Sequence, residues 1–150
     1  MDIVDTLSAI LNHKKSRAVW TIPPDHMVFE AIQLMSGKNI GALPVVRDTV
    51  LVGIVSERDY TRKVILKGRS SRDTPVGDIM TEDLVTADPS MKVLSALQLM
   101  TERSIRHLPV VVDEELTGIV SIGDLVRHVI SCQAALIDQL KDYVLGPSPR

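Results

Sequence analysis

The sequence has little of three things on which many sites depend: cysteine, aromatic side chains and long apolar runs. Cys132 is the only cysteine, which excludes an internal disulfide and a metal cluster built from several cysteines. One Phe, one Trp and two Tyr leave no aromatic platform on which single-stranded bases could stack. No apolar run approaches about 18 residues, so we expect no membrane span. The four histidines, at 13, 26, 107 and 128, show no ligand spacing, and we expect no metal site.

An excess of charge of one sign is also lacking. The formal net charge is −2, so a nucleic acid is not expected as a partner. The N-terminal residues 1–5 are acidic where a secretory signal would be basic. A hydrophobic content of 45% with a charged content of 24% is ordinary for a globular chain. We therefore expect a cytoplasmic globular protein that binds neither nucleic acid nor membrane.

Residues 21–65 and 86–130 form an internal sequence repeat. At an offset of 65, without a gap, 22 of the 45 aligned positions are identical, where chance would give roughly three or four. Leu-Pro-Val-Val at 43–46 recurs at 108–111, and Gly-Ile-Val-Ser-x-x-Asp at 53–59 recurs at 118–124. The duplication predicts two half-sites that face each other across a pseudo-two-fold axis.

Each copy predicts the order strand, helix, strand, strand, helix, and therefore a mixed α/β (α+β) fold. Apolar positions at helical spacing follow Pro-Asp at 24–25 and Pro-Ser at 89–90. β-branched runs at 43–46 and 51–55, echoed at 108–112 and 116–120, predict two hairpins. A second helix is expected from about 57 to 66 and from about 122 onward. Because one copy is too short to bury a large core alone, we expect the two to share one.

The segments outside the repeat predict two further helices. Apolar residues fall at helical spacing within 1–12, and 124–145 is one amphipathic pattern that ends before Gly146. The polar stretch 67–75 predicts a linker. We divide the chain into a first domain with the N-terminal helix at 1–70, a second domain at 76–131, and a C-terminal extension and tail at 132–150. The flanking helices are expected to cap the module or to pair two copies of it.

The Ser-x-x-Asp motif lies where a strand ends and a helix begins. The first turn of a helix offers unpaired N–H groups and a positive dipole end, which suit a phosphate. Ser56 adds a hydroxyl, and the carboxylate of Asp59 can accept from both hydroxyls of a ribose. Arg58, Arg62 and Lys63 add positive charge nearby. The same motif is also a capping box, which needs no ligand, so both interpretations stay open on the residues alone.

The second copy of this motif carries less charge. It keeps Ser121, Asp124 and Arg127, but it has glycine and histidine where the first copy has Arg58 and Lys63. It therefore has fewer cations that could neutralise a phosphate, and we expect the first site to bind a ligand more tightly.

Taken together, the repeated motifs and the linking Asp-Ile-Met-Thr at 78–81 resemble the cystathionine-β-synthase-type (CBS) domain. The chain from about residue 10 to 131 resembles a tandem pair, or Bateman module, and the stretch 56–63 resembles a subgroup of small stand-alone pairs. The resemblance implies a regulatory module that binds an adenine nucleotide (AMP, ATP or NAD) in the cleft between the two domains. It also implies a homodimer that forms through the helices.

The resemblance further implies that backbone near the start of each strand pair, together with one threonine per copy, lies against the edge of the adenine ring. With the charged residues named above, the expected nucleotide-binding set is Thr21, Ile40, Gly41, Ala42, Pro44, Ser56, Arg58, Asp59, Arg62, Lys63, Thr86, Ile105, His107, Pro109, Ser121, Asp124 and Arg127. The copies differ at these strand starts, since Ala42 is small whereas His107 could either contact a phosphate or obstruct the second site.

We expect no catalysis and no catalytic cofactor, because the sequence has neither a Gly-x-Ser-x-Gly elbow nor a Gly-rich phosphate loop before Lys-Ser/Thr. The leading hypothesis is a sensor whose output passes to another protein or through self-assembly. The alternative is a ligand-independent dimerisation or interaction scaffold. An enzyme acting on a nucleotide has less support, because nothing indicates a general acid–base pair.

Overall fold

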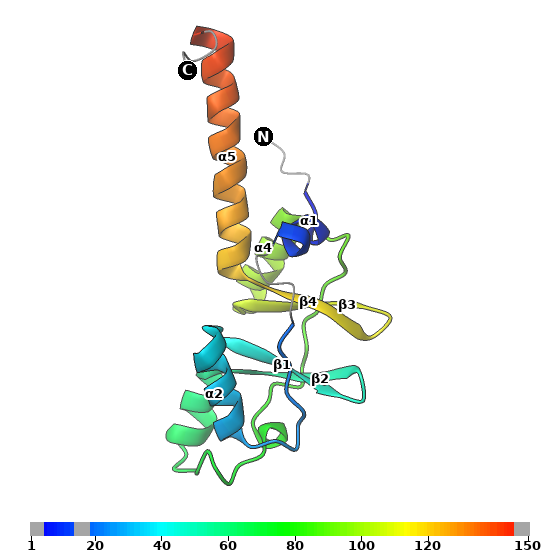
Figure 1. Ribbon diagram of the computed structural model, residues 1–150, viewed down its shortest axis with the longest axis vertical. Helices are drawn as coiled ribbons and strands as arrows, with labels where there is room; N and C mark the ends of the chain where they lie inside the picture. Colours follow the sequence, from blue (N-terminus) through cyan, green and yellow to red (C-terminus); the bar gives the residue numbers. More distant parts are fainter. Residues whose placement is uncertain (1–4, 14–18, 146–150) are drawn as a thin grey trace.

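The computed structural model describes residues 5–13 and 19–145, and the two copies of the repeat form two similar α/β units (Figure 1). The predicted fold class is confirmed. The predicted first strand of each copy is reduced to a single parallel bridge, from Ile22 to Val45 and from Ala87 to Val110. In chain order the elements are α1 (Leu7–His13), α2 (Val28–Lys38), β1 (Ala42–Arg47), β2 (Val50–Ser56), α3 (Glu57–Tyr60), the π-helical turn η1 (Thr61–Ile65), the 3₁₀ turn η2 (Val76–Asp78), α4 (Val93–Arg103), β3 (His107–Val112), β4 (Glu115–Ser121) and α5 (Ile122–Leu145).

Each unit is organised around a β-hairpin. β1 pairs antiparallel with β2, and β3 pairs with β4 in the same register 65 residues later. The two-residue turns at 48–49 and 113–114 have positive φ, the left-handed conformation that matches the twist of the flanking strands. The hairpins meet edge to edge through Val50 and Glu115, which gives a four-stranded sheet in the order β1-β2-β4-β3.

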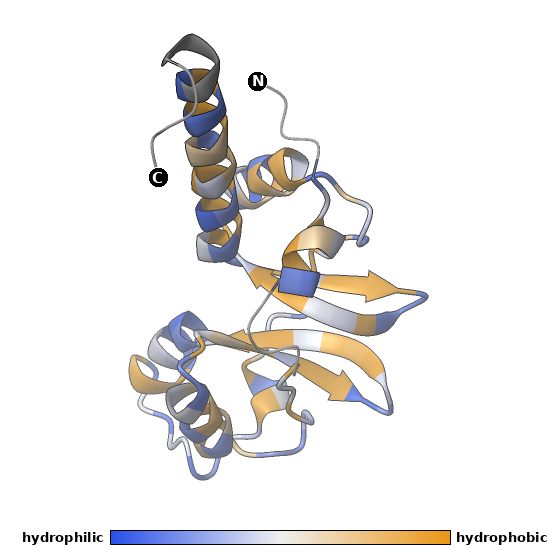
Figure 2. Ribbon diagram, turned by 45° about the horizontal axis from the view of Figure 1, so that its top comes forward, coloured by the Kyte–Doolittle hydropathy of each residue, from blue (hydrophilic) through white to orange (hydrophobic). Residues whose placement is uncertain are grey.

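The expectation of one shared core is wrong, because the buried apolar residues form two clusters, one in each unit. The hairpin strands are the most apolar segments (Figure 2), and helix α2 or α4 packs on them in each unit. Met35 of α2 and Met100 of α4 occupy corresponding places in the two cores, at 2% and 0% exposure. Each unit reaches a complete core because a segment from outside the repeat is added to it.

The segment added to each unit is the one that precedes the other repeat in the sequence. Leu7 of α1 is fully buried in the core of the second unit, whereas Val76 of η2 is fully buried in the core of the first. The backbone contacts correspond, since Leu7 N–H donates to the carbonyl of Met91 at 2.9 Å and Val76 N–H donates to that of His26 at 2.8 Å. The segment that precedes each repeat therefore packs on the other repeat.

This exchange bears on the predicted domain boundaries of 1–70, 76–131 and 132–150, which stay a prediction. The structure places the N-terminal helix α1 with the second unit, because its apolar residues complete the surface left by α4 and the β3–β4 hairpin. The two added segments correspond at an offset of 69 rather than 65 (Leu7 with Val76), so they lie outside the alignment of the repeats.

The last helix differs between the units. In the first, α3 continues into the π-helical turn η1 and ends at Ile65, close to the predicted end. In the second, α5 runs for 24 residues and projects well beyond the rest of the protein (Figure 1). None of the helices in the described part of the chain is both long and apolar enough to cross a membrane.

Candidate functional site

Helix α3 begins with a capping box formed by Ser56 and Asp59. Ser56 Oγ accepts a hydrogen bond from the N–H of Asp59 at 3.1 Å, and Asp59 Oδ2 accepts one from the N–H of Ser56 at 3.0 Å. The hydroxyl of Ser56 also donates to Oδ2 at 3.0 Å. The capping interpretation of the motif is therefore confirmed, and it leaves Asp59 only 8% exposed.

The second carboxylate oxygen of Asp59, Oδ1, is held by two more groups. The hydroxyl of Thr81 donates to it at 3.3 Å, and Lys63 Nζ lies 3.1 Å away. Lys63 also donates to the carbonyl of Ile79 at 2.9 Å, which ties α3–η1 to the segment after η2. An ionised carboxylate has about four acceptor sites, so these contacts use the capacity of Asp59. A ribose hydroxyl that binds here must replace one of them, and the bond from Thr81 is the longest.

The backbone donors expected at the start of α3 are mostly in use. The N–H of Glu57 donates to the carbonyl of Gly41 at 3.1 Å, and that of Asp59 is taken by Ser56. Among the described residues, the N–H of Arg58 alone in this first turn has no protein acceptor. An anion at this end of α3 must therefore be held mainly by side chains.

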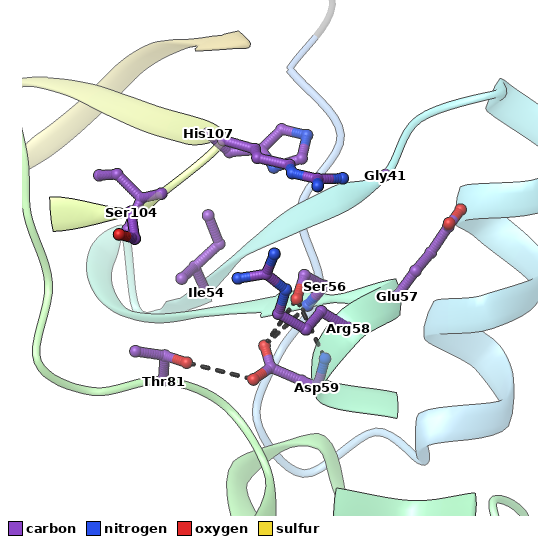
Figure 3. Close-up of a pocket in the computed structure, with 11 residues that line it drawn as sticks. Gly41, Ile54, Ser56, Glu57, Arg58, Asp59, Thr81, Ser104 and His107 are labelled. Carbon is purple, nitrogen blue, oxygen red and sulfur yellow. Dashed lines mark hydrogen bonds between the residues drawn. The ribbon is translucent and has the colours of Figure 1, made fainter. Parts of the chain in front are cut away.

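A cavity of about 300 Å³ lies beside the capping box, between the two units. This volume is at the small end of the range for small-molecule sites. Figure 3 shows Glu57 and Arg58 from the first unit on one side and Ser104 and His107 from the second on the other. The lining residues are Gly41, Ile54, Ser56, Glu57, Arg58, Asp59, Thr81, Ser104, Ile105, Arg106 and His107.

Two arginines from opposite units give the cavity its charge. Arg58 and Arg106 are both exposed, and neither makes an ion pair or a side-chain hydrogen bond with the described residues. The lining carboxylates are Glu57 and Asp59, and the charge of Asp59 is already paired with Lys63. The cavity can therefore offer two guanidinium groups to an anion.

The structure places His107 differently from the expectation that it edges the second site. Its ring lies against Gly41 of the first unit, where an added Cβ would meet Cε1 and Nε2 of His107 at 3.4 Å. His107 and Arg106 therefore line the cavity of the first motif. These two side chains, which align with Ala42 and Gly41 of the first copy, line the first site because the two units face each other.

The second motif forms the same cap at the start of α5. Ser121 N–H donates to Asp124 Oδ2 at 2.9 Å, and Ser121 Oγ accepts from the N–H of Asp124 at 3.1 Å. Arg127 Nη2 donates to Asp124 Oδ1 at 3.0 Å, although the side chain of Arg127 is 73% exposed. His128, which aligns with Lys63, is instead hydrogen-bonded to Asp5 at 2.8 Å.

The cavity brings together only part of the predicted set. Six of the predicted residues line it: Gly41, Ser56, Arg58, Asp59, Ile105 and His107. Lys63 does not line it but forms an ion pair with Asp59, which does. The remaining predicted residues do not line it and stay predictions. Three are exposed (Thr21, Arg62 and Thr86), three are buried in the hairpins (Ala42, Pro44 and Pro109), and Ile40 is half-buried. The last three belong to the second cap and its ion pair: Ser121, Asp124 and Arg127.

Five lining residues were not in the predicted set: Ile54, Glu57, Thr81, Ser104 and Arg106. Ile54 and Glu57 lie within two residues of Ser56 in the sequence, so their proximity to the motif was an available signal. Thr81 belongs to the linking stretch 78–81, and its role depends on the packing of that stretch on the first unit, where Thr81 and Ile54 exchange backbone hydrogen bonds of 2.8 and 3.0 Å. No local signal marks Ser104.

Comparison with known proteins agrees with this geometry. The family model of the CBS domain matches residues 13–65 and 76–131. A mitochondrial CBS domain-containing protein from Arabidopsis thaliana, CBSX3, is 44% identical over 150 aligned residues, covering 94% of this chain and 72% of the relative.

Solved structures agree as well. A protein with CBS domains from Burkholderia ambifaria superposes with a TM-score of 0.81 at 45% identity, over 84% of this chain and 94% of that chain. The CBS domain pair of protein MJ0100, solved in complex with 5′-methylthioadenosine and S-adenosyl-L-methionine, has a TM-score of 0.76 at 26% identity, over 85% and 98%. The chain therefore belongs to the CBS-domain family as a tandem pair, the type of module through which CBS-domain proteins are regulated.

Proposed function

We propose that this CBS pair is a non-catalytic regulatory module that binds an adenine nucleotide in the cavity beside Ser56 and Asp59. The observation that carries the proposal is the pair of guanidinium groups, Arg58 and Arg106, that line the cavity from opposite units without a protein partner among the described residues. Guanidinium groups bind phosphate through paired, charge-assisted hydrogen bonds. A phosphate held by both arginines would favour one arrangement of the two units, which is what a regulatory ligand requires.

The other lining groups suit a nucleoside. Asp59 Oδ1 can accept from a ribose hydroxyl once the hydroxyl of Thr81 is displaced. Ile54 and Ile105 supply apolar surface for the base, one from each unit. A cavity of about 300 Å³ is small, so among AMP, ATP and NAD we favour AMP.

The ligands of the MJ0100 domain pair support an adenosine-type ligand, because methylthioadenosine and S-adenosylmethionine share the adenosine group. Neither carries a phosphate. The two arginines of the present cavity therefore favour a phosphorylated adenosine, and this difference can be measured.

The experiment is a calorimetric titration of the full chain with AMP, ATP, NAD, adenosine, methylthioadenosine and S-adenosylmethionine, with melting temperature as a second readout. We expect AMP to bind and to raise the melting temperature by mass action. Adenosine and methylthioadenosine should bind more weakly because they have no phosphate. If none of the six compounds binds, the ligand-independent scaffold is the better description.

A homodimer that forms through α5 is the second part of the proposal. Apolar side chains at Val126, Ile130, Ile137 and Leu140 are 43%, 59%, 52% and 54% exposed. Their spacing of four, seven and three residues is that of a coiled-coil seam, and the helix projects from the body of the protein, where a second copy can reach it (Figure 1). Pairing of two α5 helices would cover this apolar stripe.

Sedimentation equilibrium tests the dimer. We expect the wild-type chain to sediment as a dimer and Ile137→Glu as a monomer, because the substitution puts a charge into the seam. Gln139→Glu adds the same charge at an exposed position off the stripe and should leave the dimer intact. A wild-type monomer at all concentrations would contradict this part of the proposal.

The output of the module belongs to the proposal too. Nucleotide binding would act on another protein or on self-assembly, and the ordinary charged and hydrophobic content fits a cytoplasmic location. Cross-linking of the full chain with and without AMP, followed by mass spectrometry, would reveal a change in the contacts of α5.

A further inference from the structure

Three side chains with metal-binding atoms meet where the N-terminal segment crosses α5, away from the nucleotide cavity. His128 Nε2 lies 2.8 Å from Asp5 Oδ2 and 3.6 Å from Cys132 Sγ, and Cys132 Sγ lies 3.8 Å from the same Asp5 oxygen. All three ligand atoms fall within 4.8 Å of one another. Asp5 lies just before α1, whereas His128 and Cys132 lie on α5, so the cluster joins segments that are 123 residues apart in sequence.

The arrangement is not that of a catalytic triad. In a triad, the carboxylate and the nucleophile bind opposite nitrogens of the imidazole ring. Here Asp5 and Cys132 both approach Nε2 of His128. One ring nitrogen cannot relay a proton between two groups on its own side, whereas three ligand atoms that surround one point can share a metal ion.

The distances fit a tetrahedral ion. Zinc lies about 2.3 Å from a thiolate sulfur, about 2.0–2.1 Å from an imidazole nitrogen and about 2.0–2.2 Å from a carboxylate oxygen. Tetrahedral angles then separate sulfur from nitrogen, and sulfur from oxygen, by about 3.6 Å. The observed separations are 3.6 and 3.8 Å. The 2.8 Å hydrogen bond between His128 and Asp5 would open to about 3.3 Å as the ion replaces its proton.

The surroundings also suit a metal. His128 and Cys132 are four residues apart on α5 and so lie on one face of the helix. The backbone carbonyl of Asp5 accepts the N–H of Val93 at 2.9 Å, which fixes the third ligand. The Asp5 side chain is 45% exposed and the His128 side chain 18% exposed, so an ion can enter from solvent. A thiolate, a carboxylate and a neutral imidazole neutralise a divalent cation.

Although the histidine spacing alone predicted no metal site, we propose that Asp5, His128 and Cys132 bind one divalent transition-metal ion of the zinc type, with water in the fourth position. Binding releases the thiol proton of Cys132 to solvent, because the thiolate is the ligand, and the N–H proton of the neutral His128 ring is then carried on Nδ1 instead of Nε2. The mixed sulfur and nitrogen ligands favour zinc over magnesium or calcium. The ion would fasten the N-terminal segment to α5 and thereby to the core of the second unit.

Two measurements on the wild-type chain test the site without any substitution. Co²⁺ added to the reduced, metal-free protein should give the visible bands of a tetrahedral ion and a thiolate charge-transfer band. Because Cys132 is the only cysteine, modification by a thiol reagent reports on this site alone. One equivalent of Zn²⁺ should slow that modification, and a chelator should restore it. Absence of both the charge-transfer band and the protection would overturn the proposal.

Substitutions then assign the ligands. Cys132→Ser and His128→Gln should each weaken Zn²⁺ binding, measured by competition with a chromogenic chelator, by more than about 100-fold, since even the loss of a second-shell partner costs 10–100-fold. His26→Gln is the matched control, because His26 forms a surface pair with Glu30 at 2.8 Å that includes no thiol. The control should keep wild-type affinity. Stoichiometric zinc binding that survives both ligand substitutions in folded protein would also overturn the assignment.

Discussion

Replacement of Arg58 by glutamine gives the sharpest prediction for the nucleotide cavity. The change removes one of the two guanidinium groups that line the cavity and leaves the capping box of Ser56 and Asp59 intact. A hydrogen bond to a charged group contributes about 1.5–3 kcal/mol. Arg58 is exposed, so the lower end of that range applies. About 1.5 kcal/mol corresponds to an increase of about tenfold in the dissociation constant of AMP.

Calorimetric titration at low and at high salt measures this effect. Adenosine should bind Arg58→Gln as well as it binds the wild type, because it has no phosphate. Arg47→Gln is the matched control, since Arg47 is exposed at the end of β1, does not line the cavity, is not in the predicted binding set and loses the same charge. The tenfold difference should shrink as salt rises, because exposed charges are screened. An equal loss of AMP and adenosine binding, or an equal effect of the two arginine substitutions, would mean that Arg58 does not bind the phosphate.

Three further substitutions test the remaining contacts. Thr81→Val should tighten AMP binding by about two- to tenfold, because it removes the hydrogen bond from Thr81 to Asp59, worth about 0.5–1.5 kcal/mol, which the ribose must otherwise break. Weaker AMP binding in calorimetry would mean that the Thr81 hydroxyl contacts the ligand. Asp59→Ala should abolish AMP binding while Asp124→Ala preserves it, and a larger loss in the second variant would contradict the preference for the first site. Gly53→Ala should lower the free energy of unfolding by about 1–3 kcal/mol, because the new Cβ would lie 2.6 Å from Sδ of Met80 and 3.1 Å from the carbonyl of Thr81. Gly37→Ala is its control in urea denaturation, since nothing lies within 4 Å there, and it should stabilise α2 by about 0.5–1 kcal/mol.

The sequence predicted the parts of the fold that depend on local pattern. The β-branched runs at 43–46 and 51–55 predicted the first hairpin, and the offset of 65 carried the same prediction to the second. The Ser-x-x-Asp spacing predicted the capping box, because that motif is completed within one helical turn. These features need no knowledge of how the two units pack.

The features that escaped prediction depend on that packing. The exchange of α1 and η2 between the units could not be read from the repeat, because the two segments correspond at a different offset and share little beyond apolar character. The contact of Thr81 with Asp59 follows from that exchange. His107 was visible as a point of divergence between the copies, but only the facing of the units places it, together with Arg106, in the cavity of the first motif.

A crystal structure of the full chain grown with AMP would show whether the cavity between the units binds the nucleotide. We predict AMP in the cavity between the units, with its phosphate bonded to Arg58 or Arg106 and a ribose hydroxyl bonded to Asp59 in place of Thr81. AMP bound only at the cap of Ser121 and Asp124, or an empty cavity in crystals grown at a saturating AMP concentration, would contradict it.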